Sequence, residues 1–355
     1  MTIFFIPSAK GIRKLNVHIV YSFQVEQFGR IDANAVYLDE LILELRQLGM
    51  GCHMFGLWTG AVGFADDLLL MAPSRDTMAA MLDVCEQYAE RLNLFFSTDV
   101  DPAKSKSKCI FVTGTRLRNV TLPTPLKLYG QDLPWVNHAT HLGHELHKDG
   151  NMDYDCKLKR GRFIDCSTDI RETFKFANPP QILKTVQVYC CDMYGSMLWN
   201  LYGKQSEQFF RCWNTCTKLS WDLPRSTHTY FVDSLLSCGM PSTRQQALNR
   251  YVKFFRSLLS SPSKEVAIIA RVIGQNASTN TGKNLLNISL ETNLSTWSSP
   301  LSKFHEVLEK EIEAPEEEKW RISLLKGYLR IRQEQQLSCC DTEYIDNLIS
   351  SLCST

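Results

Sequence analysis

The tetrapeptide Phe64-Ala65-Asp66-Asp67 is the part of this sequence whose residue types are best suited to chemistry. It places two adjacent carboxylates between a glycine-rich apolar stretch, residues 56–63, and the apolar run Leu68–Met71. An apolar–turn–apolar pattern predicts a tight β-hairpin with the acids at its tip. Carboxylates at a tip reach solvent and avoid the cost of burying unpaired charge. Such hard oxygen ligands suit Mg²⁺, which often takes one or two carboxylates plus substrate phosphates.

The acid pair by itself supplies only part of a two-metal site. Two-metal phosphoryl transfer needs carboxylates from two strands that together hold both ions. Successive side chains of a strand point to opposite faces, so Asp66 and Asp67 cannot supply both sides. We expect Asp66 to be the first metal ligand, with Asp67 beside it. The alternative is a solvated surface turn, which an Asp-Asp pair often forms, although the strongly apolar surroundings favour chemistry.

The segments after the acid pair predict an α+β sheet domain. Ser74 is suited to cap a helix, and the apolar residues that follow recur at helical spacing over about 75–93. Residues 109–112 then predict a strand. Helices packed between strands, without regular βαβ alternation, are typical of an α+β fold.

Helices are expected to dominate beyond about residue 150. Pro179-Pro180 is expected to open one helix and Pro241 to begin another. Serine, asparagine and threonine are frequent over 275–303, which predicts a linker or irregular segment. Further helices are expected over 303–313, over about 316–336 and after Asp341.

Basic residues form three groups that are candidates for holding nucleic-acid phosphates. The groups are Lys104, Lys106 and Lys108; Lys157, Lys159, Arg160 and Arg162; and Arg244, Arg250, Lys253 and Arg256. Phosphate contacts would give a salt-dependent affinity that is blind to base sequence. The alternative for each group is a solvated helix or strand face. The net charge of +1, from 39 basic and 38 acidic residues, neither supports nor excludes nucleic-acid binding.

Four histidines, His138, His141, His144 and His147, recur at every third position. A metal site is one interpretation of such a run. A spacing of three does not keep four side chains on one face of a helix or a strand. We therefore expect ordinary positions in a sheet.

The composition indicates a folded intracellular protein of two or three domains. The chain has 355 residues, of which 44% are hydrophobic, enough for a packed core. Its 13 cysteines show no pair of CxxC motifs, so reduced, buried thiols are expected rather than a zinc site. We find no secretory signal and no apolar run of the roughly 20 residues that a membrane span needs. We expect a cytoplasmic or nuclear location and no membrane partner.

The acid pair belongs to an ordered series of segments over roughly 36–285 that carry a family resemblance. The other segments are Tyr37–Leu41, Ala72–Ser74, Asn93–Thr98, Lys104–Phe111, His141–His144, Tyr194–Trp199, Trp213–Trp221 and Pro224–Thr227. Together they resemble the reverse transcriptase, an RNA-directed DNA polymerase, of non-LTR retrotransposons, and Phe64–Asp67 resembles its Tyr/Phe-Ala-Asp-Asp box.

The resemblance implies a polymerase palm followed by a helical thumb. The expected divisions are a leader unrelated to the palm at 1–30, a partial palm at 31–147, a thumb-like helical region at 148–274, and a C-terminal linker with helices at 275–355. The palm is expected to be an antiparallel hairpin sheet with packed helices. The family catalyses RNA-templated DNA synthesis by Mg²⁺-dependent nucleotidyl transfer, with an RNA or DNA template-primer as partner. On this basis Lys106 and Lys108 are expected near the nucleotide or the strand end.

The resemblance also identifies parts of the family pattern that this sequence lacks. The family's first catalytic Asp lies on an earlier palm strand, but residues 1–35 offer only Asp32, without the flanking pattern. The Gln-Gly box ahead of the palm helix is also absent. We therefore expect an N-terminally truncated polymerase that is inactive alone. The alternative is a non-enzymatic retrotransposon remnant that acts at most as a nucleic-acid- or protein-binding module, with self-association through an uncovered palm surface.

Overall fold

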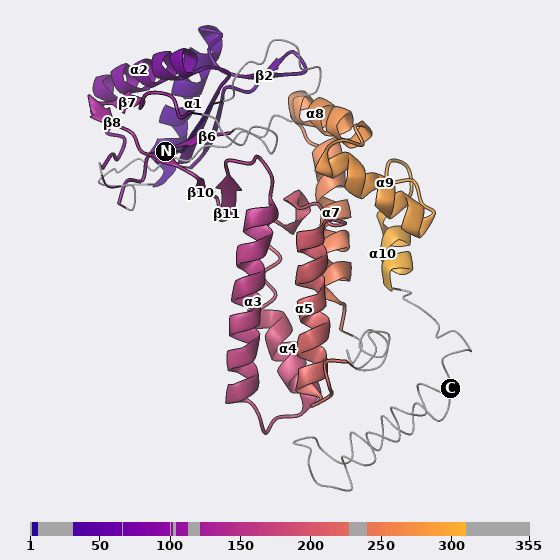
Figure 1. Ribbon diagram of the computed structural model, residues 1–355. Coiled ribbons are helices and arrows are strands. Elements are labelled where there is room, and N and C mark those ends of the chain that lie inside the picture. The colour runs from indigo at the N-terminus through magenta and orange to yellow at the C-terminus, as the bar shows by residue number, and fades with distance from the viewer. Residues whose placement is uncertain are drawn as a thin grey trace, which may run out of the picture. The chain divides into compact units, whose positions relative to one another are not determined.

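The computed structural model divides the chain into two units, each of which is described by itself. The first unit comprises Met1–Asp155 and Ser263–Ile269, and the second comprises Cys156–Pro262 and Ala270–Thr355. The residues that the structure describes are 2–5, 31–65, 67–99, 101, 104–112, 121–226 and 240–309. The first unit combines a sheet with helices, whereas the second is mainly helical (Figure 1). The predicted α+β class is confirmed at this level.

A five-stranded sheet of order β4-β5-β1-β6-β9 forms the framework of the first unit. Its strands are β1 (Thr2–Phe5), β4 (Ala61–Phe64), β5 (Asp67–Ala72), β6 (Lys108–Phe111) and β9 (Trp135–Val136). β4 and β5 pair antiparallel, as predicted. The β1–β5, β1–β6 and β6–β9 pairs are parallel, so the sheet is mixed and the expectation of an antiparallel sheet is wrong for these pairs.

Two helices cover one face of this sheet and contact each other (Figure 1). Helix α1 (Ile31–Gln47) contacts β4, and helix α2 (Arg75–Arg91) contacts β5 and β1. As predicted, Ser74 caps α2, because its side chain accepts a hydrogen bond from the backbone N–H of Thr77. The buried residues of α2 share one core with Leu68–Ala72 of β5.

A β-hairpin covers the opposite face of the sheet at β6. Strands β10 (His138–His141) and β11 (His144–His147) form this hairpin. Side chains alternate along β6, so Cys109 lies in the core on the helix side, whereas Ile110 packs with Ala139 and Leu146 of the hairpin. Two smaller hairpins are β2 (His53–Met54) with β3 (Leu57–Trp58), and β7 (Lys127–Leu128) with β8 (Gln131–Asp132).

Helices and one 3₁₀ turn make up the second unit. They are α3 (Asp153–Thr173), α4 (Pro179–Tyr189), η1 (Ser196–Leu198), α5 (Lys204–Ser220), α7 (Thr243–Leu259), α8 (Lys264–Gln275), α9 (Asn280–Thr292) and α10 (Leu301–Glu309), although the first residues of α3 and the first half of α8 are assigned to the first unit. Large aromatic side chains hold this unit together. The ring of Phe209 on α5 lies 5.8 Å from the ring of Phe163 on α3 and 5.3 Å from that of Trp199. Helix α4 begins at Pro179-Pro180, as the sequence predicted.

Helix α9 (Asn280–Thr292) lies in the middle of the expected irregular segment at 275–303. Thr279 caps this helix by accepting a hydrogen bond from the backbone N–H of Gly282. Leu285 and Ile288 provide its buried apolar face. Asn284 is also fully buried. Its amide can be buried at low cost because it donates to the carbonyl of Trp199 and accepts from the backbone N–H of Leu201. The expectation of an irregular segment is wrong over Asn280–Thr292, where the polar Asn284 is satisfied by partners far along the chain and Thr279 caps the helix locally.

The C-terminal helices that were expected beyond residue 309 lie outside the described residues. Helix α10 covers Leu301–Glu309, at the start of the first of them. Among the helices that the structure describes, none has the length and apolar character needed to cross a membrane.

Residues Thr2–Phe5 form strand β1 of the five-stranded sheet. Sequence reasoning treats residues 1–30 as a leader unrelated to the palm, and the pattern there shows no clear periodicity. Thr2–Phe5 nevertheless pairs on both sides, with Leu69–Ala72 of β5 and with Lys108–Phe111 of β6. Thr2–Phe5 therefore form the central strand of the five-stranded sheet.

Replacing Phe4 by proline tests the role of β1 in stability. Proline removes a backbone donor from a strand that is paired on both sides and leaves an acceptor unpaired, so Phe4→Pro should lower the free energy of unfolding by about 1–3 kcal/mol. Phe4→Val keeps the donor and the strand preference and should cost clearly less. Urea unfolding of both variants measures the difference. Equal losses would show that the pairing of β1 does not support the sheet.

Candidate functional site

The acid pair lies at the predicted hairpin turn. In the pairing of β4 with β5, Phe64 is opposite Asp67, so Ala65 and Asp66 form a two-residue connection. Asp67 is the first residue of β5 and is half-buried, while the Phe64 side chain is 65% exposed. Asp66 lies outside the described residues. The structure therefore confirms the hairpin and the position of Asp67 at the start of its second strand.

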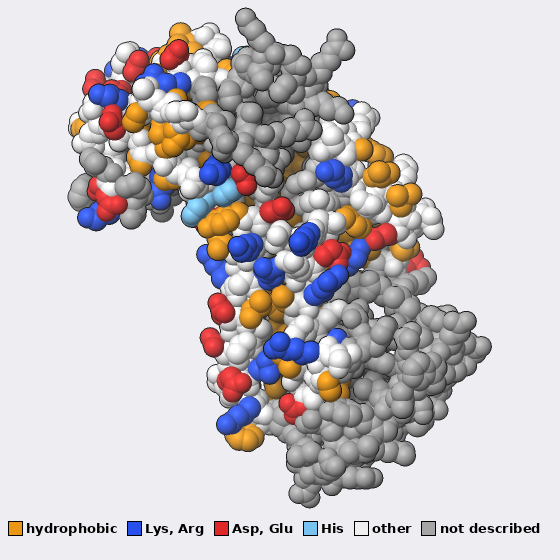
Figure 2. Space-filling model, viewed as in Figure 1, with side chains coloured by type: hydrophobic (Ala, Val, Ile, Leu, Met, Phe, Trp, Pro, Cys, Tyr) orange, Lys and Arg blue, Asp and Glu red, His pale blue; other side chains and the backbone are white. Residues whose placement is uncertain are grey.

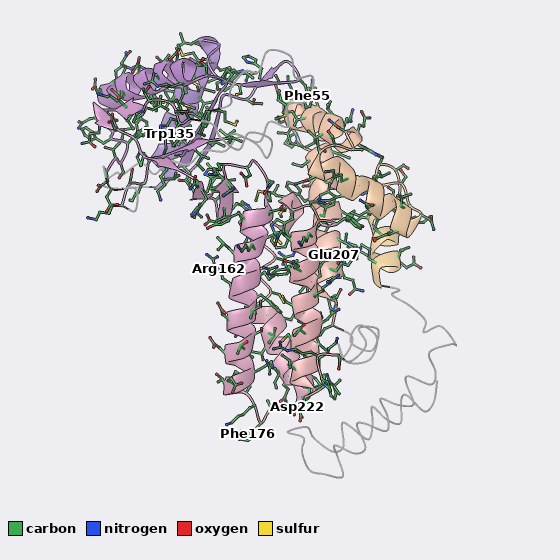
Figure 3. All side chains as sticks on the ribbon, in the orientation of Figure 1. Phe55, Trp135, Arg162, Phe176, Glu207 and Asp222 are labelled. Carbon is green, nitrogen blue, oxygen red and sulfur yellow. The ribbon has the colours of Figure 1, made fainter. Side chains whose placement is uncertain are left out.

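The backbone of this turn is unfavourable for its residues. Hairpin connections of two residues generally need positive φ, which is the reason glycine is common in them. Three other hairpins of the described residues have such connections, Phe55-Gly56, Tyr129-Gly130 and Leu142-Gly143, each with positive φ at both residues (Phe55 is labelled in Figure 3). At the acid turn Ala65 has φ of +53°, and the second residue is Asp66 instead of glycine. The first positions are alike, since Phe55, Tyr129 and Leu142 have φ values close to that of Ala65, so this turn differs from the others in having a side chain at its second position.

The strand beside β5 brings no carboxylate to the acid pair. Strand β1 is Thr2-Ile3-Phe4-Phe5, and its first residue is opposite Leu69, two residues beyond Asp67. Within the part of the chain that the structure describes, no three His, Cys, Asp or Glu side chains are grouped so as to hold a metal ion. Asp66, the first expected ligand, lies outside the described residues, so the Mg²⁺ site that the resemblance implies stays a prediction.

The first basic group has the alternating geometry that its sequence predicted. Lys104 and Lys106 are exposed, whereas Ser105 and Ser107 between them are buried. The Ser107 hydroxyl donates to the carbonyl of Ser97 at 2.6 Å, and the Ser105 hydroxyl donates to the carbonyl of Ser107 at 2.6 Å. The buried serines therefore anchor the segment and turn the lysines outward. Lys104 lies 3.9 Å from a carboxylate oxygen of Asp101.

Lys108 follows directly in the chain, as the half-buried first residue of β6. Sequence reasoning identified the three lysines but not the serines that position them. The alternation of serine with lysine over residues 104–108 was the available signal.

The second basic group divides between the interior and the surface. Lys159 is only 4% exposed, and its ammonium group donates to the carbonyl of Tyr194 and lies 5.6 Å from the centre of the Tyr194 ring. Arg160 donates to the side chain of Gln208. Lys157 and Arg162 are exposed on α3, where Arg162 is labelled (Figure 3). Two of these four predicted phosphate ligands are therefore engaged within the helical unit.

The third basic group also contains two residues that are engaged within the helical unit and two that are exposed. Arg244 lies 2.6 Å from a carboxylate oxygen of Glu291 and 3.6 Å from one of Glu207. Arg256 donates to the carbonyl of Ser299, and its guanidinium lies 5.5 Å from the centre of the Phe304 ring. Arg250 and Lys253 are exposed. On the visible face of the helical unit, basic side chains are interspersed with acidic and apolar ones and form no continuous basic surface (Figure 2).

The four histidines occupy facing positions in the β10–β11 hairpin, which confirms the predicted sheet positions. His138 is opposite His147, and His141 is opposite His144. The ring of Tyr154 lies 4.7 Å from that of His138 and 5.2 Å from that of His147. Burial lowers the pKa of His141 to about 4, and the neighbouring His144 adds to this effect. His141 is therefore neutral at pH 7 and acts as a packing residue of the hairpin.

No protein-family model matches this chain, and no curated protein matches it at a significant level. The resemblance to reverse transcriptases thus rests on the residues themselves.

Replacing Ala65 by glycine measures the cost of the acid turn. Glycine takes a φ of +53° without the steric penalty of a Cβ atom, so Ala65→Gly should raise the free energy of unfolding by about 1 kcal/mol. Ala61→Gly is the matched control, because Ala61 lies within β4 and glycine there should lower stability by about 1 kcal/mol. Denaturant unfolding that finds both variants destabilised would contradict a strained turn at Ala65.

Proposed function

We propose that this chain is a reverse-transcriptase-related protein that retains the palm hairpin and binds nucleic acid without synthesising it. The observation that carries the proposal is the turn at Ala65-Asp66. Ala65 has a φ of +53°, and at the second position, where the three other two-residue hairpin turns of the described residues have glycine, this sequence has Asp66, followed by Asp67. An acidic residue kept at a turn position where glycine is favoured points to a function, past or present, in chemistry.

The order of elements around the hairpin supports a palm. Strand β5 leads through Ser74 into α2, and the segment 104–107 then leads into β6 in the same sheet. Sequence segments that resemble the reverse-transcriptase palm lie on these elements in the family's order. The helices after residue 153 are consistent with a thumb-like region, with Trp199 and Trp213 of the resembling segments fully buried.

The strand next to the acid pair argues against polymerisation by the isolated chain. Two-metal nucleotidyl transfer uses carboxylates from neighbouring strands to hold both ions. In this protein the neighbouring strand is Thr2-Ile3-Phe4-Phe5, which has no carboxylate. Asp66 and Asp67 would have to act without a carboxylate from that strand. We therefore propose that the chain does not extend a primer, which a primer-extension assay measures directly.

The lysines at 104–108 are the strongest candidates for contact with nucleic acid. Lys104 and Lys106 point outward from a segment that is anchored by buried serines, and Lys108 continues the alternation into β6. Three cations at alternate positions suit a run of phosphates. Affinity from such contacts is independent of base sequence and falls steeply with salt.

A protein-binding module is the second candidate function. Strand β4 is at the edge of the five-stranded sheet, and its Val62 and Phe64 side chains are 48% and 65% exposed. An exposed apolar edge strand is a ready surface for pairing with another chain. In this case the lysine segment would not bind nucleic acid.

A salt titration of binding to single-stranded RNA separates these two functions. The wild-type chain should bind at low salt, and the logarithm of its affinity should fall linearly with the logarithm of salt concentration. Replacing Lys104, Lys106 and Lys108 together by alanine should reduce the magnitude of that slope by about 2, because each phosphate that a lysine neutralises contributes about 0.7 to it. Filter binding or fluorescence anisotropy provides the measurement.

The control is the triple replacement of Lys175, Lys184 and Lys204 by alanine. These lysines are exposed in the second unit, so the control changes net charge by the same amount. It should leave the slope close to that of the wild type. Equal effects of the two triple variants would contradict a site at Lys104–Lys108. If the wild type itself shows no affinity at low salt, the nucleic-acid function fails and the protein-binding alternative remains.

A further inference from the structure

Two cysteines of the second unit lie in direct contact although they are far apart in the sequence. The Sγ atoms of Cys166 and Cys190 are 2.7 Å apart across a separation of 24 residues. Both are free thiols in this structure. Cys166 is on α3, and Cys190 is the C-cap residue that directly follows α4. A disulfide needs a sulfur–sulfur distance of about 2.05 Å, so only a small movement separates the two thiols from a bond.

The two cysteines differ in the backbone structure around them. Cys166 lies in the middle of α3, a helix of 21 residues. Cys190 directly follows α4, and residues 191–193 after it have no regular secondary structure. The backbone N–H of Cys190 still bonds the carbonyl of Val186, so the residue is held near Cys166 but is not enclosed in a helix. A shift of Cys190 alone can therefore close the distance.

The two sulfurs also differ in their access to solvent. Cys166 is half-buried, whereas Cys190 is 6% exposed. Tyr189, next to Cys190, is 74% exposed, and its carbonyl lies 3.9 Å from the Cys166 sulfur. Burial and the adjacent Cys166 raise the pKa of the Cys190 thiol, so Cys190 carries little thiolate at pH 7. A reagent in solution thus meets the Cys166 sulfur first.

We propose that Cys166 and Cys190 form a reversible redox pair, in which Cys166 reacts with a small-molecule disulfide such as oxidised glutathione and Cys190 resolves the product. In the first step the Cys166 thiolate attacks one glutathione sulfur, the glutathione disulfide breaks, and one glutathione leaves as thiolate. In the second step the Cys190 thiol gives its proton to that thiolate or to water, and its sulfur attacks the Cys166 sulfur. The mixed disulfide breaks and the second glutathione leaves, so two protein thiols are oxidised and one glutathione disulfide is reduced to two thiols.

The resulting bond would tie α3 to the end of α4. It would close a loop that contains the rest of α3 and all of α4. Cross-linking such a loop restricts the unfolded chain and stabilises the folded one. The inference is independent of the nucleic-acid function proposed above, because it concerns a different unit and a different chemistry.

Two neighbouring cysteines are the competing partners that an experiment must exclude. Cys191 and Cys216 lie close enough to Cys190 to influence its pKa electrostatically. Burial raises the pKa of Cys191 to about 12 and raises that of Cys216. These thiols are therefore poor first nucleophiles, but either could resolve a mixed disulfide at Cys166.

Peptide mapping after oxidation tests the pair directly. The full chain is incubated with oxidised glutathione, then denatured and alkylated, and its alkylated cysteines are counted by mass spectrometry. We expect two fewer than the 13 in the reduced chain, with a cross-linked peptide joining Cys166 to Cys190. Cys190 and Cys191 share a tryptic peptide, so the Cys191→Ser variant assigns the sulfur and should keep the cross-link. Thermal unfolding should shift upward by about 5–10 °C on oxidation and return on reduction.

The matched control is Cys212→Ser, which removes a half-buried thiol of the same unit and should leave the cross-link intact. Cys166→Ser and Cys190→Ser should each abolish it. Glutathione that stays on Cys166, a cross-link through Cys191 or Cys216, or no oxidation at all would overturn the proposal. Mapping of the wild-type chain decides between these outcomes even if a serine variant does not fold.

Discussion

The arrangement of the first unit depends on strand β5, which is buried along nearly its whole length. Leu68–Ala72 pack against α1 and α2 while the strand pairs with β4 on one side and β1 on the other. A charged residue in that interior would be unpaired and costly, so the carboxylates can lie only where the strand begins. The pairing of Phe64 with Asp67 then leaves two residues for the turn, and Ala65 must adopt positive φ. Burial of one strand thus fixes both the position of the acids and the strain beside them.

Local hydrogen-bond partners explain why the basic residues that the sequence analysis singled out differ in exposure. Lys104 and Lys106 stay outside because the serines between them make the inward hydrogen bonds. Lys159 and Arg160 turn inward because Tyr194 and Gln208 offer them acceptors. Charge in the sequence is therefore a poor guide to a binding surface until the local hydrogen-bond partners are known. Because Lys104 and Lys106 are exposed and Lys159 is buried, we propose that the nucleic-acid contact is made by the lysines of the first unit.

Short-range sequence patterns predicted the acid hairpin and helix α2, which are set by residues close together in the chain. The acid hairpin followed from apolar runs around a short turn, and α2 followed from Ser74 and helical spacing. The sequence could not predict β1, because a four-residue strand without periodicity becomes visible only through its partners β5 and β6. Helix α9 was missed because asparagine is typical of loops, although the buried Asn284 amide bonds the backbone near Trp199. Long-range pairing, rather than local preference, decided both elements.

We propose that the acid pair is a polymerase feature that lacks the carboxylate on a neighbouring strand that catalysis needs. Primer extension tests it most directly, with the intact chain, an oligo(dT) primer on poly(rA), and Mg²⁺ or Mn²⁺. We predict no extended product above that of a variant carrying Asp66→Ala and Asp67→Ala, while a known reverse transcriptase extends the primer in parallel. Extension by the wild-type chain that disappears in the double variant would contradict this claim, since the two carboxylates would then suffice for nucleotidyl transfer.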